Sequence, residues 1–164
     1  MNSKNKATAN TLGYAKKWYS EGIQFECQGS GKCCASHGEF GYVYFTNSDL
    51  KRVAKTMNIS VKKFKELYAT QVDKIWALKE NPKGPDCIFL KKNRCEIYEG
   101  RPTQCRTWPF WPEVMNAKSW KKSVESFCPG INKGRLYSAL EIEKIILEQK
   151  NSTRDLITER ISSS

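Results

Sequence analysis

Residues 87–105 read CIFLKKNRCEIYEGRPTQC and hold the clearest local structural signals of this chain. Two apolar runs flank the polar residues KKNR, a pattern that predicts a β-hairpin with Cys87 on one arm and Cys95 on the other. Pro102 stands where a proline starts a short helix, because the N–H that proline lacks has no helical partner at that position. Cys105 would lie in this helix. The stretch therefore predicts a hairpin and a short helix that both carry thiols.

An earlier stretch, residues 27–34, reads CQGSGKCC and adds three thiols. Its two glycines give the loop the freedom to turn Cys27 and Cys33 toward one ion or cluster. Cys33 and Cys34 are adjacent, and neighbouring side chains on an extended backbone point apart. We therefore expect one of these two thiols to serve a second metal or to be buried as a small hydrophobic group. Ser30 stands where a further thiol would fit the spacing, and its protonated hydroxyl is a poor ligand, which suggests an open or water-filled position.

The cysteine count indicates metal binding more than disulfides. No apolar run is long enough for a secretory signal or a membrane span, so we expect a cytoplasmic protein in a reducing compartment. Thiols there more often bind metal or do redox chemistry, and an odd number cannot all pair. Buried structural or redox thiols remain the alternative. The candidate metal ligands are Cys27, Cys33, Cys34, Cys87, Cys95, Cys105 and Cys128.

The cysteine segments resemble a known family. The strings FECQGSGKCC, CIFL, CEIYEGRPTQCRTWPF and CPG, between about Phe25 and Gly130, are similar to those of the YkgJ-type cysteine-cluster family, described as a zinc- or iron-chelating domain. That family has the form CxxCxxCC in its first loop, and Ser30 takes the place of the second cysteine here. The resemblance implies a metal site but no established reaction, and it leaves an iron-sulfur cluster and zinc both open as the cofactor.

Positive side chains near the cysteines fit such a site. Four thiolates around Zn²⁺, or around an oxidised four-iron cluster, carry a net charge near −2 that nearby cations or N–H donors offset. Lys32, Arg101 and Arg106 lie within the motif and are the candidates, although each arginine could equally be paired with a carboxylate at the surface. His37 could replace the missing thiol, but nothing in its spacing demands ligation, and a partly exposed loop side chain is the favoured interpretation.

The rest of the chain predicts short elements of both kinds. We expect a strand at 42–45, a helix capped by Thr46 or Ser48, a helix capped by Ser60 and another strand within 114–127. Residues 75–78 could line a strand or finish a helix, and a strand is the favoured interpretation. Ser138 and Glu141 form a capping box for a last helix, with Leu140, Ile145 and Leu147 supplying much of its apolar content and Ile142 and Ile146 on an adjoining face.

These elements predict an α+β fold, a small cysteine-rich domain of short helices packed on short strands and hairpins, closed by a C-terminal helix. The chain has 164 residues, the size of one domain. We expect a flexible basic tail at 1–14, a single domain at 15–150 and a polar, loosely held tail at 151–164.

Charge and motifs set the functional alternatives. Lys and Arg number 28 against 17 Asp and Glu, a net charge of +11, but they are spread along the chain, which favours a solvated surface over a nucleic-acid footprint. A metal-binding protein for electron transfer, metal handling or assistance to an enzyme, with a protein redox or enzyme partner, is the first hypothesis. The alternatives are a metal-braced nucleic-acid-binding module and a thiol redox protein without metal. No catalytic triad, phosphate loop or paired-carboxylate motif is visible, so the sequence does not decide whether the protein is an enzyme.

Overall fold

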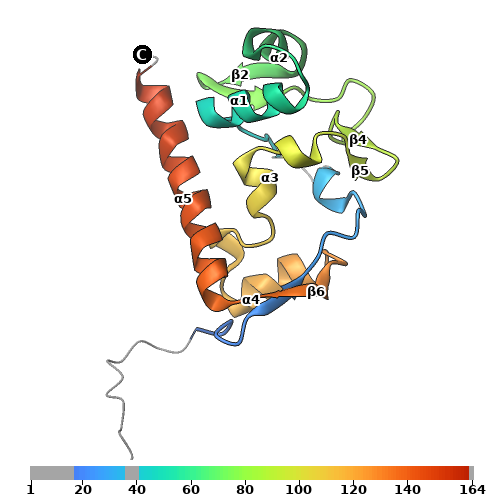
Figure 1. Cartoon of the computed structure of the whole chain (residues 1–164), viewed down its shortest axis with the longest axis vertical. Coiled ribbons are helices and arrows are strands. Elements are labelled where there is room, and N and C mark those ends of the chain that lie inside the picture. Colours follow the sequence, from blue (N-terminus) through green and yellow to red (C-terminus); the bar gives the residue numbers. More distant parts are fainter. Residues whose placement is uncertain (1–16, 36–40, 163–164) are drawn as a thin grey trace, which may run out of the picture.

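The computed structural model describes residues 17–35 and 41–162 and has the predicted α+β class (Figure 1). The predicted tail 1–14 and His37 lie outside these residues. Within them, the strands form antiparallel pairs, β1 with β6, β2 with β3 and β4 with β5. The elements in chain order are β1 (Ile23–Phe25), the 3-10 helix η1 (Lys32–Cys34), α1 (Asn47–Thr56), α2 (Val61–Tyr68), β2 (Ala69–Val72), β3 (Ile75–Leu78), β4 (Leu90–Lys91), β5 (Arg94–Cys95), the 3-10 helix η2 (Tyr98–Gly100), α3 (Thr103–Thr107), the 3-10 helix η3 (Pro112–Val114), α4 (Ala117–Trp120), the π-helical turn η4 (Lys121–Glu125), β6 (Ile131–Tyr137) and α5 (Ala139–Ser162).

A first apolar cluster forms around α1 and α2, and both predicted caps are confirmed. The Thr46 hydroxyl accepts from the Asp49 N–H while the Asp49 carboxylate accepts from the Thr46 N–H, and Ser60 caps α2. The rings of Phe45 and Phe64 meet edge to face, with their centroids 5.3 Å apart. The first cluster comprises Phe45, Leu50, Val53, Ala54, Phe64, Ala69, Leu78, Phe89 and Ile97.

The hairpin β2–β3 covers this cluster. The strand expected at 75–78 is confirmed as β3, but the one expected at 42–45 is reduced to a single bridge between Tyr44 and Ala77. The Phe45 N–H donates to the Trp76 carbonyl, and Val43 accepts from the Leu78 N–H, so this segment runs beside β3 only briefly before α1 begins.

A second apolar cluster joins the first residues of the described chain to the start of the last helix. It comprises Tyr19, Ile23, Phe110, Trp120, Val124, Ile131, Ile142 and Ile146. The prediction of a strand within 114–127 is wrong, because this segment forms α4 and η4. Trp120 and Val124 are both buried and lie four residues apart, the spacing of one helical face. The strand of this region is β6, which pairs with β1.

The last helix, α5, begins at the predicted capping box and runs farther than expected. The Ser138 N–H donates to Glu141, and the Ser138 hydroxyl accepts from the Glu141 N–H. Ile142 and Ile146 are its buried residues, whereas Leu140 and Leu147 are exposed, so the adjoining face is the one that docks. The segment after Lys150, expected to be a loose polar tail, is helical to Ser162. It contains no Gly or Pro, and the Asn47 N–H donates to Glu159, 3.0 Å away.

The helix α5 extends along one side of the molecule, from the second cluster to the start of α1 (Figure 1). Neither α5 nor any other helix within 17–35 and 41–162 combines the length and the apolar character that a membrane crossing requires.

Candidate metal centre

The predicted hairpin is formed by β4 and β5 and holds Cys95 in its second strand. Lys92 and Asn93, at its tip, both have positive φ, as a type I′ turn requires. Leu90 is paired with Cys95, while Cys87 lies three residues before β4 and not in a strand. Backbone N–H groups point at both sulfurs: those of Phe89 and Leu90 at Cys87, and that of Ile97 at Cys95. Such donors stabilise thiolates, which is the form that binds metal.

The loop of residues 27–34 lies against this hairpin. Gly31 has a φ of 69°, and a Cβ at this position would lie 3.1 Å from the Leu90 Cδ1 atom, so a side chain here would be strained and crowded. A Cβ at Gly29 would likewise face the Arg94 side chain, but only at ordinary contact distance. The Cys87 N–H donates to the Cys34 carbonyl over 2.7 Å. The loop is thereby fixed beside the thiols of the hairpin.

Cys33 and Cys34 do not point apart as expected. They lie in the 3-10 helix η1, not on an extended backbone, and their sulfurs are 3.9 Å apart. Zinc with four thiolates at about 2.3 Å in a tetrahedron has sulfurs about 3.8 Å apart. The two adjacent thiols are therefore spaced as ligands of one metal ion would be.

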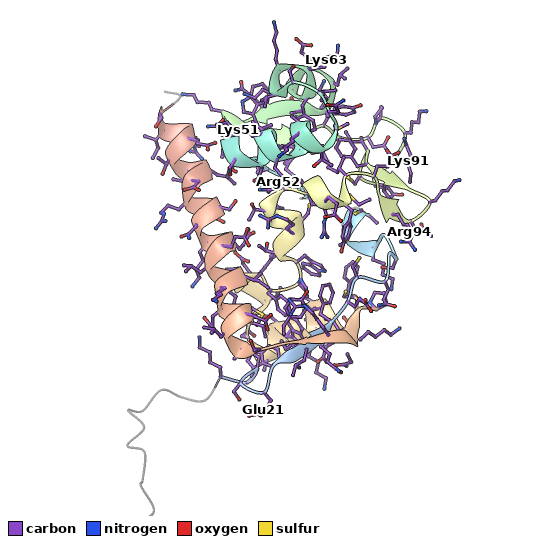
Figure 2. All side chains as sticks on the ribbon, in the orientation of Figure 1. Glu21, Lys51, Arg52, Lys63, Lys91 and Arg94 are labelled. Atoms are coloured by element: carbon purple, nitrogen blue, oxygen red, sulfur yellow. The ribbon has the colours of Figure 1, made fainter. Side chains whose placement is uncertain are left out.

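A clamp from α1 fixes the segment that carries Arg101 and Cys105. Asp49 is almost fully buried, and its carboxylate accepts from the N–H and the hydroxyl of Thr103, at the start of α3, both at 2.9 Å. Arg52 pairs with Asp49 and donates to the Arg101 carbonyl through Nε (3.2 Å) and Nη2 (3.1 Å). Figure 2 shows Arg52 between α1 and α3. Cys105 lies in α3, as the sequence predicted.

The electrostatics of the thiols show that they interact as a group. A hydrogen bond from Cys34 lowers the pKa of Cys33 to about 6, with help from Arg101 and against the effect of burial. The pKa of Cys34 is raised by the same hydrogen bond and by burial. Burial raises the pKa values of Cys87 and Cys95, and that of Cys105 to about 12.

Cys33 is the member common to these interactions. Its negative charge is among the causes that raise the pKa of each of four other thiols, those of Cys34, Cys87, Cys95 and Cys105. Cys27 acts on Cys95 in the same sense. Six of the seven predicted ligands are thus within electrostatic reach of at least one other.

The seventh, Cys128, packs against the second cluster, whereas Cys87 and Cys95 pack against the first. The backbone still places Cys128 toward Cys27, because the Glu26 N–H donates to the Gly130 carbonyl and so joins the segments next to both cysteines. All seven cysteines are free thiols.

The thiols are near one another but not closed around one point. In residues 17–35 and 41–162, no three His, Cys, Asp or Glu side chains are close enough to hold a metal ion. Ser30 is exposed, and its hydroxyl lies 3.5 Å from the Lys32 N–H. The donor set nonetheless suits zinc or iron in chemistry, because it consists of free soft thiols with N–H donors beside them.

The three predicted cationic residues have different positions. Arg101 lies beside the thiols and acts on Cys33, Cys95 and Cys105, with its guanidinium 3.6 Å from the centroid of the Tyr98 ring. Arg106 instead pairs with Glu148 of α5 at 2.5 Å. The Lys32 ammonium lies 5.9 Å from the centroid of the Phe127 ring, next to Cys128.

Sequence reasoning missed the part played by Asp49 and Arg52. Asp49 was recognisable only as a residue of the first helical turn. Its contact with Thr103 joins residues 54 positions apart, which no local pattern indicates.

The chain is similar in sequence to a protein of unknown function. An uncharacterised protein of Methanocaldococcus jannaschii is 33% identical over 103 residues, which cover 61% of this chain and 52% of the relative. The chain thus spans about half the length of this curated relative. No solved structure shows significant similarity to the chain.

The family model matches residues 26–129, the segment that carries all seven cysteines, and is described as "Putative zinc- or iron-chelating domain". This match covers more than half of the chain. The protein belongs to the CxxCxxCC family.

Proposed function

We propose that this protein binds zinc or iron through thiolates of Cys33, Cys34, Cys87 and Cys95, with Cys27 and Cys105 at the border of the site. The observation that carries the proposal is the central position of Cys33. It lies 3.9 Å from Cys34, and its charge acts on the thiols of the hairpin and of α3. Cys128, on the second cluster, stays a predicted ligand.

Charge balance supports a cation at this position. Ionised thiols this close repel one another, which is one reason why the pKa values of Cys34, Cys87 and Cys95 are raised. A bound cation would relieve this repulsion, and Arg101 and the backbone N–H groups would offset the remaining negative charge. Because thiols must lose protons to bind, we expect metal affinity to increase with pH.

The chemistry depends on which metal is held. Zinc closed by four thiolates would brace the fold, whereas iron or an iron-sulfur cluster would supply electron transfer. In either case the chain's own residues hold the thiols: the hairpin orients Cys87 and Cys95, η1 orients Cys33 and Cys34, and the Asp49 clamp positions Arg101 and Cys105. Free thiols agree with work in a reducing cytoplasm.

Anaerobic purification followed by metal and sulfide analysis and an absorption spectrum tests the proposal. Iron with inorganic sulfide and visible absorption would identify a cluster, and colourless protein with zinc the alternative. Cys87→Ser should lose the metal. Metal-free wild-type protein of normal stability would contradict the proposal.

The two arginines form a matched pair of variants. Arg101→Gln should weaken metal retention because it removes the cation beside Cys33, whereas Arg106→Gln, whose partner is Glu148, should not. Equal metal loss in both would contradict the assignment of Arg101. Cys128→Ser then decides whether the second cluster contributes a ligand.

The spacing of Cys33 and Cys34 also favours a second candidate, a thiol redox protein that uses this pair without metal. That function requires the two thiols to oxidise reversibly in a protein purified free of metal. Mass spectrometry after mild oxidation would then find Cys33 joined to Cys34, and Cys87→Ser would leave this reaction unchanged.

A further inference from the structure

The surface over α2 and the β2–β3 hairpin has a hollow that the metal site does not use. Its volume is about 770 Å³, and its lining includes Lys62, Lys65, Glu66, Gln71, Trp76 and Lys79, which we call the Trp76 surface. It lies on elements at the top of Figure 1, whereas η1 and its two cysteines lie lower in the same view.

Three ammonium groups and one carboxylate give this surface an excess of positive charge. Lys62 and Lys65 are one turn apart on α2, and Lys79 follows β3 directly. The Lys79 ammonium donates to the Glu66 carbonyl over 2.7 Å, which holds it beside the hollow that Lys79 lines. The whole chain, at +11, would attract a polyanion toward this surface.

Trp76 supplies an aromatic face among these cations. It is only half-buried, and the Lys65 ammonium lies 4.5 Å from the centroid of its ring. A cation–π contact of this kind is weak at an exposed site, so a planar base can displace the lysine from the ring. The ammonium is then free to contact a phosphate.

The surface continues into a second hollow that shares Trp76 with the first. A second hollow, of about 340 Å³, is also lined by Gln71 and Trp76, together with Lys74 of the hairpin turn, Asn47 at the start of α1 and one carboxylate, that of Glu159 on α5. Gln71 and Trp76 are cross-strand partners, so one amide and one indole lie between the two hollows. A chain-like ligand could thus pass across the indole, which a single enclosed pocket would not allow.

We propose that the Trp76 surface binds single-stranded nucleic acid, with Lys62, Lys65 and Lys79 on phosphates and a base stacked on Trp76. Cations that follow a backbone, beside an aromatic ring that accepts any base, are the two components of sequence-tolerant binding to single strands. The proposal is independent of the metal site, since it uses neither the cysteines nor Arg101.

Fluorescence anisotropy of the metal-loaded protein with labelled DNA and RNA oligonucleotides of about 12 nucleotides tests it, with duplex DNA as comparison. We expect binding to the single strands that weakens steeply between about 50 and 200 mM salt. Tighter binding of either the RNA or the DNA single strand supports the proposal and identifies which of the two is the preferred ligand. No binding at about 50 mM salt, or duplex binding as tight as single-strand binding, would overturn it.

Matched charge variants separate this surface from diffuse attraction. Lys62→Gln with Lys65→Gln should weaken binding about tenfold at about 0.1 M salt and make the slope of log K against log salt shallower by about 1.4. The control is Lys118→Gln with Lys121→Gln, which removes two exposed lysines with the same spacing at the other end of the molecule (Figure 1). An equal loss in the control would overturn the proposal.

The indole has its own pair of variants. Trp76→Leu should weaken binding about tenfold without changing the salt slope, whereas Trp76→Phe, which keeps a ring, should retain most of the affinity. Unchanged binding in a folded Trp76→Leu protein would rule out stacking. If Trp76→Leu does not fold, the test rests on Trp76→Phe and on the charge variants. Trp76→Phe should still lose a measurable part of the affinity for the single strand.

Discussion

The two apolar clusters are built differently. The first is local in sequence, since all its buried members lie between Phe45 and Ile97, and Cys87 and Cys95 pack against it. The second joins distant parts of the chain, from Tyr19 and Ile23 to Ile142 and Ile146, and has Cys128 at its edge. Helix α5 connects the two, because it is buried in the second cluster and reaches the start of α1 through Glu159.

This difference shows which part of the fold positions the thiols. The hairpin and the Asp49 clamp depend on α1 and on the first cluster, and η1 is fixed to Cys87 by a backbone hydrogen bond. The second cluster brings the start of the described chain to the first turns of α5 and holds α3 from the other side, where the Thr107 hydroxyl donates to Gln149 of α5. The first cluster should therefore govern metal retention more strongly than the second.

The largest expected effect comes from opening one cluster at a time. Phe64 and Ile142 are fully buried, one in each cluster. Phe64→Ala should cost about 3–5 kcal/mol of the free energy of unfolding and Ile142→Ala about 2–5 kcal/mol, through lost burial and the cavities left behind. Denaturant unfolding gives these values. Metal analysis of the folded variants should show loss only for Phe64→Ala, and equal loss in Ile142→Ala would contradict the division between the clusters.

A smaller effect tests the clamp between α1 and α3. Asp49→Asn keeps the shape of the side chain but removes the charge that faces Arg52 and turns one acceptor into a donor beside Thr103, at a cost of about 2–3 kcal/mol. Metal should dissociate faster from this variant, because α3 carries Cys105.

Glu159→Gln is the matched control. It changes the other carboxylate at the start of α1, and the amide oxygen of the variant can still accept from the Asn47 N–H. We expect Glu159→Gln to lower the free energy of unfolding by less than about 0.5 kcal/mol and to leave the rate of metal dissociation unchanged. Metal dissociation that is equally fast from wild type and from folded Asp49→Asn would show that the clamp does not position the site.

The same division explains what the sequence could predict. Elements of the first cluster, and α3 clamped to it, have local signals: the caps at Thr46 and Ser60, the polar turn of the β4–β5 hairpin, and Pro102 before α3. These signals involve residues only a few positions apart, so the local sequence is enough to predict the elements.

Apart from the capping box that starts α5, the elements of the second cluster depend on partners far along the chain. Only Ile131 is buried in β6, which is held by its pairing with β1 and shows no alternating apolar pattern. The sequence predicts a strand within 114–127, although Trp120 and Val124 have the spacing of a helical face. In the candidate site, the pairing of Arg106 with Glu148 and the approach of Cys33 to Cys34 arise from tertiary contacts and from a turn that spacing alone did not indicate.

The smallest effect concerns η1, which links the loop to the first cluster. In metal-free protein, the pKa of Cys33 is lowered to about 6, first by the hydrogen bond from Cys34. Because the thiolate is the reactive form and is present above this pKa, the alkylation rate of Cys33 should increase about tenfold between pH 5 and pH 7. Cys34→Ala removes the donor, so the increase should move to higher pH.

Cys34→Ser is the control, since its hydroxyl can still donate to the Cys33 thiolate and should keep much of the wild-type profile. Mass spectrometry of the alkylated peptide measures each rate. If the alkylation rate of Cys33 depends on pH in the same way in Cys34→Ala and in wild type, the two sulfurs do not interact in solution. The 3.9 Å spacing that suits them as ligands of one metal would then not hold in solution either. A shift in Cys34→Ala alone would show that η1 holds this pair together before any metal binds, through the loop that Cys87 fixes to the hairpin.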